Sequence, residues 1–186
     1  MKRRSCIGLL VGLSVLGFAP VARAQAFAEG PQASAWFERA GRLAGFTTGQ
    51  GEGAPAAVIF FDARCPHCTR LWSDARRMDG SIRLRWVPVV LLSPASARQA
   101  AALLRAGDPS AAMDAHAQSL AAGGEGIAAE EPDDEETRAL KENTASLRAM
   151  EVASVPAILH RDRSGRIGLT VGAMPASRLA RLVSEN

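Results

Sequence analysis

Two of the three cysteines in this 186-residue chain lie close together, in the sequence Cys65-Pro66-His67-Cys68. Thiols at this spacing form a disulfide with each other and exchange it with the thiols and disulfides of other proteins. A purely structural bridge here would close a very short loop and would stabilise the fold by only about 2 kcal/mol. The spacing therefore favours a redox-active dithiol.

A metal site is the other reading of two neighbouring cysteines. Zinc needs about four protein ligands in a structural site. Outside the dithiol the chain has only two histidines, His116 and His160, and neither stands at ligand spacing from another candidate ligand. We therefore rank both the metal site and the structural bridge below the redox interpretation, and we expect no bound metal.

The residues around the pair predict a strand followed by a helix. Residues 56–61 form a continuous apolar run, which is typical of a strand buried on both faces. Pro66 suits the first turn of a helix, because its missing N–H would have no helical partner there. Residues 69–78 are compatible with the rest of that helix.

Cys65 then lies at the helix N-terminus, where free N–H groups and the helix dipole stabilise an anion. A thiolate in this position has a lowered pKa and is the attacking or the leaving sulfur in disulfide exchange. His67 would add a donor or a positive charge if it faces the same sulfur. Cys68, one turn further along, is the natural resolving thiol. Cys65, Pro66, His67 and Cys68 are therefore the candidate catalytic residues.

The first 24 residues have the pattern of a secretory signal peptide. Basic residues 2–4 precede an apolar run at 7–18, and Ala22-Arg23-Ala24 gives an Ala-x-Ala cleavage pattern. The apolar run is shorter than the roughly 20 residues of a membrane-spanning helix, so an uncleaved anchor is the weaker alternative. Cleavage after Ala24 would remove Cys6 and leave the mature chain in the periplasm, an oxidising compartment.

The basic character of the chain comes from this same segment. The net charge is +3, from 22 basic and 19 acidic residues, and the first 24 residues hold four of the bases and no acid. The remaining chain has 18 bases and 19 acids, a net charge of −1, and carries no RNA-binding signature. We therefore expect no nucleic-acid partner.

The remaining pattern predicts an α/β fold. We expect a helix at 34–44, a glycine-rich linker at 47–55, strands at 56–61, 82–92, 155–160 and 167–171, and a closing helix at 175–184. The predicted domains are a signal peptide at 1–24, an N-terminal helix and linker at 25–55, and a domain at 56–186 with a helical insertion at about 93–151.

The insertion is predicted from its helix signals. Asp108 and Pro109 indicate an N-cap and a first-turn proline, and the glycines of residues 123–126 end that helix. The acidic run at 130–136 is interpreted as a solvated loop, in which Asp133 and Glu136 are spaced as a capping box.

Some isolated residues are interpreted as structural. His116 and His160 are expected at the surface or at a strand edge, and Trp72 in the core. The same holds for three methionines that we expect to pack rather than to bind a metal: Met113, Met150 and Met174.

The order of elements, with the dithiol at the first strand-to-helix junction, resembles a thioredoxin-like fold with a helical insertion. Residues 61–68, Phe-Asp-Ala-Arg-Cys-Pro-His-Cys, and the downstream Trp72 resemble the DsbC/DsbG type of periplasmic thiol:disulfide interchange proteins. Residues 150–158 resemble the family's cis-proline loop. The resemblance covers about residues 56–186. It implies that Pro156 is cis and faces the dithiol, and that Val155 offers its backbone to an extended substrate segment.

Three features depart from that family. Only residues 25–55 precede the first predicted strand, which leaves no room for an N-terminal dimerisation domain and predicts a monomer. The Pro-His dipeptide and Val155 are both choices of the related oxidase DsbA. Ile59, in contrast, follows the isomerase branch, because thioredoxin and DsbA carry a buried acid at this position.

We therefore expect thiol–disulfide exchange through Cys65, in the oxidising direction, on cysteines of secreted or periplasmic proteins. The redox-active disulfide would be the only cofactor, and the resemblance implies reoxidation by a membrane partner of the DsbB type. One alternative is a reductase or isomerase kept reduced by a DsbD-type partner. Another is a periplasmic Cu(I)-binding protein that uses the two cysteines and His67.

Overall fold

The computed structural model describes residues 31–50, 52–78, 80, 82–162 and 164–184. The predicted signal peptide and its cleavage site at Ala24 lie outside these residues. In chain order the elements are α1 (Pro31–Arg42), β1 (Phe46–Thr48), β2 (Ala57–Phe61), α2 (Pro66–Ala75), β3 (Leu84–Pro88), α3 (Pro94–Arg105), α4 (Pro109–Ala121), α5 (Asp134–Ala149), β4 (Ala157–Arg161), β5 (Ile167–Val171) and α6 (Ala176–Ser184).

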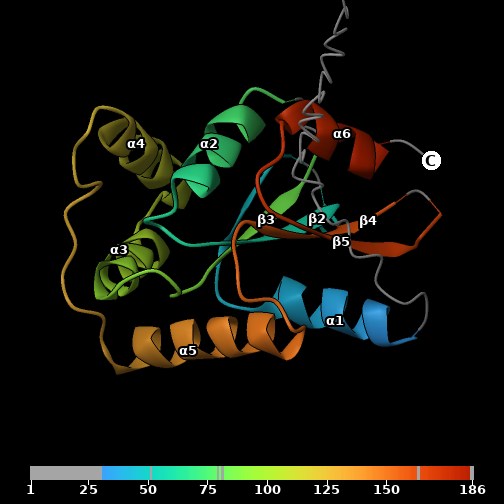
Figure 1. The fold of residues 1–186 in the computed structure, drawn as a ribbon, viewed down its shortest axis with the longest axis horizontal. Coiled ribbons are helices and arrows are strands. Elements are labelled where there is room, and N and C mark those ends of the chain that lie inside the picture. Colours follow the sequence, from blue (N-terminus) through green and yellow to red (C-terminus); the bar gives the residue numbers. More distant parts are fainter. Residues whose placement is uncertain (1–30, 51, 79, 81, 163, 185–186) are drawn as a thin grey trace, which may run out of the picture.

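The strands form one sheet in the order β1-β3-β2-β4-β5. Strands β2 and β3 are parallel, and the other neighbours are antiparallel. Helices α2, α4 and α6 cover one face of the sheet, and α1 and α5 cover the other (Figure 1). Helix α3 contacts both α4 and α5. The predicted α/β architecture with a helical insertion is confirmed.

Strand β2 is apolar throughout because it lies in the middle of this arrangement. Ile59 and Phe61 pack into the cluster under α2, α4 and α6, whereas Val58 and Phe60 pack into the cluster under α1 and α5. Alternate side chains of a strand point to opposite faces, so both sets must be apolar. The continuous run therefore forms the central strand of the sheet, and the dithiol follows directly after its end.

The predicted N-terminal boundary is wrong. Part of the expected linker is strand β1, in which Thr47 pairs with Arg85 of β3. Helix α1 is no free linker either, because Phe37 and Leu43 are buried in the core cluster that also holds Val58. A three-residue strand beside glycines gives too little periodicity to be recognised, so the domain begins well before residue 56.

The second predicted strand, at 82–92, is also too long. Strand β3 ends at Pro88, although the residues that follow it are apolar. The Val89 N–H still donates to the Phe61 carbonyl at 2.8 Å, and from Val90 onward the backbone is held by side chains. The Val90 N–H donates to Thr144 Oγ1 at 3.0 Å, and the N–H groups of Leu91 and Leu92 donate to Asp62 Oδ2 at 2.8 and 3.1 Å. These polar partners replace the sheet ladder and turn the chain toward the insertion.

The helix signals of the insertion are confirmed. Asp108 caps α4 by accepting the N–H groups of Ser110 and Ala111, and Pro109 occupies the first turn. Asp133 and Glu136 form the predicted capping box at the start of α5. Each cap satisfies N–H groups that the helix itself leaves without a partner.

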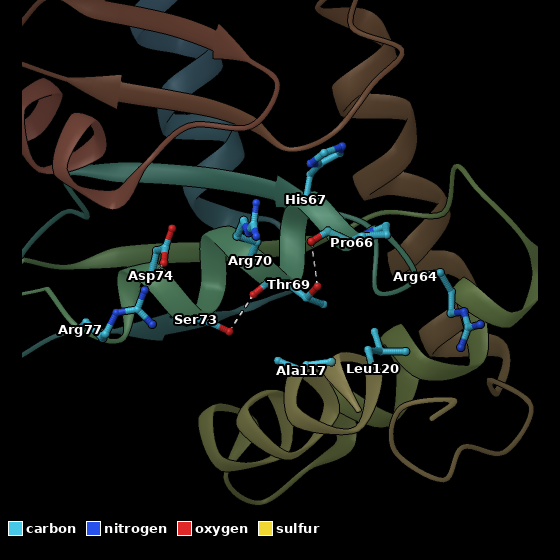
Figure 2. Close-up of a pocket in the computed structure, with 11 residues that line it drawn as sticks. Arg64, Pro66, His67, Thr69, Arg70, Ser73, Asp74, Arg77, Ala117 and Leu120 are labelled. Atoms are coloured by element: carbon cyan, nitrogen blue, oxygen red, sulfur yellow. Dashed lines mark hydrogen bonds and ion pairs between the residues drawn. The ribbon is translucent and has the colours of Figure 1, made fainter. Parts of the chain in front are cut away.

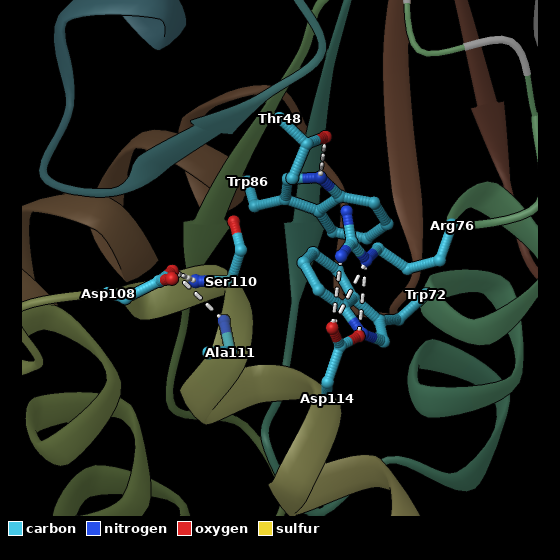
Figure 3. Close-up of polar contacts among 8 residues, drawn as sticks. All are labelled: Thr48, Trp72, Arg76, Trp86, Asp108, Ser110, Ala111 and Asp114. Carbon is cyan, nitrogen blue, oxygen red and sulfur yellow. Dashed lines mark hydrogen bonds and ion pairs between the residues drawn. The ribbon is translucent and has the colours of Figure 1, made fainter.

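Helix α4 is tied to α2 by one carboxylate, that of Asp114. It accepts a hydrogen bond from Trp72 Nε1 at 2.8 Å and pairs with the guanidinium of Arg76 at 3.1 Å (Figure 3). The Trp72 ring also meets the Trp86 ring edge-on at 4.8 Å between centroids, and Trp86 Nε1 donates to Thr48 Oγ1. These contacts connect the insertion, α2 and the sheet.

Within the described residues, no helix is both long and apolar enough to cross a membrane.

The burial of α1 gives a direct test of its place in the domain. We expect Phe37→Ala to lower the free energy of unfolding by about 3–5 kcal/mol, because it leaves a cavity between α1 and the sheet. Arg39→Ala, on the exposed side of the same helix, should change it by less than about 0.5 kcal/mol. Urea unfolding measures both. A small effect of Phe37→Ala would mean that α1 is an appendage.

Candidate active site

The dithiol lies at the junction of β2 and α2. Cys65 is the N-cap residue of α2, with an extended backbone, and Pro66 occupies the first turn. The N–H groups of Cys68 and Thr69 donate to the Cys65 carbonyl at 3.0 and 3.1 Å, which starts the helix. Both cysteines are free thiols, with 5% of Cys65 and 1% of Cys68 exposed. Both side chains are buried, and Cys65 keeps the larger exposed fraction, so it is the outer sulfur of the pair.

The two thiols have opposite pKa shifts. The pKa of Cys65 is lowered to about 6, chiefly because the Cys68 thiol donates a hydrogen bond to its sulfur. Burial acts in the other direction, and the N–H groups of Cys68 and His67 and the charge of His67 add to the lowering. Burial raises the pKa of Cys68, as does its role as donor to Cys65. At neutral pH the pair is therefore an outer thiolate and an inner thiol.

The loop before β4 faces the outer sulfur. The Val155-Pro156 peptide bond is cis. When protonated, Cys65 Sγ donates to the Val155 carbonyl at 3.8 Å. Val155 is half-buried and Pro156 is buried. Residues 90 positions apart in the chain are thus brought together at the dithiol.

His67 is exposed on the first turn of α2 and lines a groove between α2 and α4, together with Pro66 (Figure 2). All six residues predicted for the site, Cys65, Pro66, His67, Cys68, Val155 and Pro156, therefore gather around the N-terminus of α2.

Sequence reasoning missed Asp62 as part of this site. Its carboxylate is fully buried, and besides the N–H groups of Leu91 and Leu92 it accepts that of Arg64 at 2.8 Å. The backbone carbonyl of Asp62 accepts the Cys65 N–H. Asp62 thus holds the loop that carries Cys65 against the segment after β3. An acid at the end of an apolar strand was the available signal, since such a group needs partners when it is buried.

The expectation of a surface position for His116 is wrong. The residue is fully buried on α4, where Nε2 lies 2.7 Å from the Ala63 carbonyl and Nδ1 accepts the Ile127 N–H. Burial lowers its pKa, so the ring is neutral and donates through Nε2. His116 therefore fixes the loop before Cys65 to the insertion.

The interpretation of Trp72 and of the three methionines as packing residues is confirmed. Trp72 is 1% exposed and shares an apolar cluster with both cysteines and Ile59. The three methionines singled out above are buried as well: Met113, Met150 and Met174. Among the described residues, no three His, Cys, Asp or Glu side chains gather as metal ligands would.

The fold and the dithiol at the N-terminus of α2 define a thioredoxin-like protein. The chain belongs to the thioredoxin-like domain family, whose model matches residues 46–185. This match begins at β1, in agreement with the corrected boundary.

Within that family, the chain is similar to the thiol:disulfide interchange protein DsbG of Pseudomonas aeruginosa, with 28% identity over 155 residues. The match covers 82% of this chain and 60% of the relative, so the chain spans less than two thirds of that protein's length.

Solved structures show the same fold. The catalytic domain of Proteus mirabilis ScsC has a TM-score of 0.60 and 21% identity, and the match covers 82% of this chain and 95% of that one. A disulfide interchange protein of Neisseria gonorrhoeae has a TM-score of 0.55 and 20% identity, with coverages of 75% and 93%.

The hydrogen bond from Cys68 predicts how the Cys65 thiolate responds to substitution. Alkylation of Cys65 should rise with a midpoint near pH 6 in the reduced protein. Cys68→Ala removes the donor and should move the midpoint toward the ordinary value of about 8.5. Cys68→Ser keeps a donor and should move it less. Equal midpoints in the two variants would contradict the assignment of Cys68 as the main cause.

The hydrogen bonds of the Asp62 carboxylate predict a loss of stability in two variants of this residue. Asp62→Ala leaves three N–H groups without their acceptor and should lower the free energy of unfolding by about 2–4 kcal/mol. Asp62→Asn keeps one oxygen and should lose less. Urea unfolding of the reduced proteins measures both losses. An equal loss in the two variants would mean that these hydrogen bonds do not carry the effect.

Proposed function

We propose that the protein is a periplasmic thiol-disulfide oxidoreductase that donates the Cys65–Cys68 disulfide to cysteines of secreted or periplasmic proteins. The observation that carries this proposal is the asymmetric dithiol, in which Cys65 is a thiolate with a pKa of about 6 and Cys68, the more deeply buried of the two, stays a thiol. A low pKa at the outer sulfur makes it a good leaving group and stabilises the reduced form, which favours the oxidising direction.

The reaction has two steps. A substrate thiolate attacks Cys65 Sγ, the Cys65–Cys68 bond breaks, and Cys68 leaves with the electron pair and takes up a proton. The second substrate thiol, once deprotonated, attacks the substrate sulfur of the mixed disulfide, and Cys65 leaves as a thiolate. The substrate has lost two electrons and gained a disulfide, and the protein has gained the two electrons as a dithiol.

The surrounding residues support each step. The N–H groups of the first turn of α2 receive the charge that returns to Cys65. The carbonyl of Val155 lies beside that sulfur, where an extended substrate segment would reach both. We further propose that Pro156 shapes this loop, that a DsbB-type membrane partner reoxidises the dithiol, and that the chain works as a monomer after cleavage near Ala24.

The second candidate function is that of a reductase or isomerase. Two observations favour it: the similarity to a DsbG protein, and the fully buried Ile59 at the position where oxidases of this fold carry an acid. In that case Cys65 would attack a wrong substrate disulfide, and a DsbD-type partner would keep the dithiol reduced.

A transfer experiment tests the proposal. Oxidised protein is mixed with a reduced peptide that contains two cysteines, and disulfides are counted by mass spectrometry. We expect one peptide disulfide for each protein disulfide lost, and none with Cys65→Ser. If the peptide stays reduced while reduced protein opens a mispaired substrate disulfide, the reductase or isomerase function is the correct one.

Trapping provides the matched control for the attacking sulfur. Reduced Cys68→Ser, mixed with a substrate that contains a disulfide, should accumulate a stable mixed disulfide through Cys65. Reduced Cys65→Ser should accumulate none, because Cys68 is only 1% exposed and burial raises its pKa, which keeps it a thiol. Trapping through Cys68 instead would reverse the assigned roles.

The lowered pKa of Cys65 also makes stability depend on pH. Between about pH 6 and pH 8.5 the unfolded reduced chain holds a proton on Cys65 that the folded chain has lost. The free energy of unfolding of the reduced protein, relative to Cys65→Ser, should therefore rise across this window and fall as the pH drops through 6. Urea unfolding at several pH values measures it, and a flat difference would contradict the lowered pKa.

A further inference from the structure

The groove between α2 and α4 begins one residue from Cys65. Pro66 and His67 form its start, and α4 contributes Ala117, Leu120 and Ala121 as an apolar wall. Figure 2 shows the two helices facing each other across it, with Arg64 at one end and Arg77 at the other. A substrate segment that leaves the reacting sulfur in this direction therefore enters the groove.

The walls of the groove are held in place. Asp114 ties α4 to Trp72 and Arg76 of α2, and His116 ties α4 to the Ala63 carbonyl at 2.7 Å. Both residues lie on the same helix as the apolar wall. The groove is thus formed before a ligand arrives, which lowers the entropy that binding must offset.

The charge around the groove is mostly positive. Three arginines and one aspartate line it, which is a net charge of +2 without His67. The aspartate, Asp74, already pairs with Arg77. Arg64 donates to the Glu125 carbonyl, a neutral partner. Arg70 is exposed and, in the part of the chain that the structure describes, pairs with no carboxylate.

From these observations we infer that the groove binds an acidic segment of the protein substrate, next to the reacting cysteine. Carboxylates of that segment would meet Arg64 and Arg70, and its small apolar residues would lie on Leu120. The N-terminus of α2 lies at Pro66, at the start of the groove, and the positive end of the helix dipole there also favours a negatively charged ligand. This inference rests on the proposed function and deepens it, because it names the class of substrate that the site prefers.

The test uses two single-cysteine peptides, one with Asp and Glu around the cysteine and one with Asn and Gln. Each cysteine carries a thiopyridyl disulfide. The Cys65 thiolate of the reduced protein attacks the peptide sulfur, a mixed disulfide forms, and pyridine-2-thiolate leaves and is measured by its absorbance. Each rate is divided by that of 2-mercaptoethanol with the same peptide, which removes the intrinsic reactivity of the peptide.

We expect the acidic peptide to react about tenfold faster than the neutral one at low salt. The ratio should fall toward one between about 0.01 M and about 1 M salt, where the Debye length shrinks from roughly 30 Å to 3 Å. Arg70→Glu should abolish the preference and Arg70→Lys should keep most of it. The matched control is Arg138→Glu, an exposed charge reversal on α5 at the opposite face of the sheet, which should leave the ratio unchanged.

Equal rates for the two peptides would overturn the inference and leave the proposed function intact. An equal effect of Arg138→Glu and Arg70→Glu would also overturn it, because the preference would then reflect net charge alone. A release of pyridine-2-thiolate no faster than that of Cys65→Ser would instead count against the proposed function itself.

Discussion

The chemistry of this site depends most on the negative charge that the structure stabilises on Cys65 Sγ. The Cys68 thiol and the N–H groups of Cys68 and His67 all donate toward Cys65, and together they outweigh the burial that would keep it protonated. The donors lie in the right place because Cys65 caps α2 and Pro66 starts the helix directly after it. Stabilising this charge stabilises the reduced dithiol relative to the disulfide, so the local geometry of one helical turn acts on the reduction potential of the pair.

Holding that turn in place takes polar contacts from distant parts of the chain. Asp62 joins the loop before Cys65 to the segment after β3, and His116 joins the same loop to the insertion. Both side chains are fully buried, and each has partners for its polar atoms. Buried polar groups specify an arrangement because losing a partner is costly. The helical insertion is therefore part of the support of the active site.

Much of this was predictable from the sequence where the signals are local. The dithiol, the apolar β2 and the caps at Asp108 and Asp133 depend on neighbouring residues, and the structure has each element where the pattern predicted it. Strand β1 was missed because three residues carry too little periodicity.

The contacts that sequence reasoning missed are tertiary. The burial of His116 and the acceptor role of Asp62 join segments 53 and 29 residues apart, and no local pattern indicates such pairs. The apolar run at 82–92 predicts a strand up to residue 92, whereas β3 ends at Pro88. The hydroxyl of Thr144 and the carboxylate of Asp62, which accept the backbone N–H groups beyond that point, lie elsewhere in the chain, so the run itself does not indicate the end of the strand. The groove beside the dithiol is likewise invisible in sequence, since its two walls come from different helices.

The reduction potential of the dithiol formed by Cys65 and Cys68, equilibrated against glutathione buffers, tests the central claim most directly. If the charge on Cys65 is stabilised as described, the potential should lie near that of strong oxidants, about −120 mV. A value of about −200 mV or lower would contradict the oxidising role and would assign the protein to the reductases or isomerases of this fold.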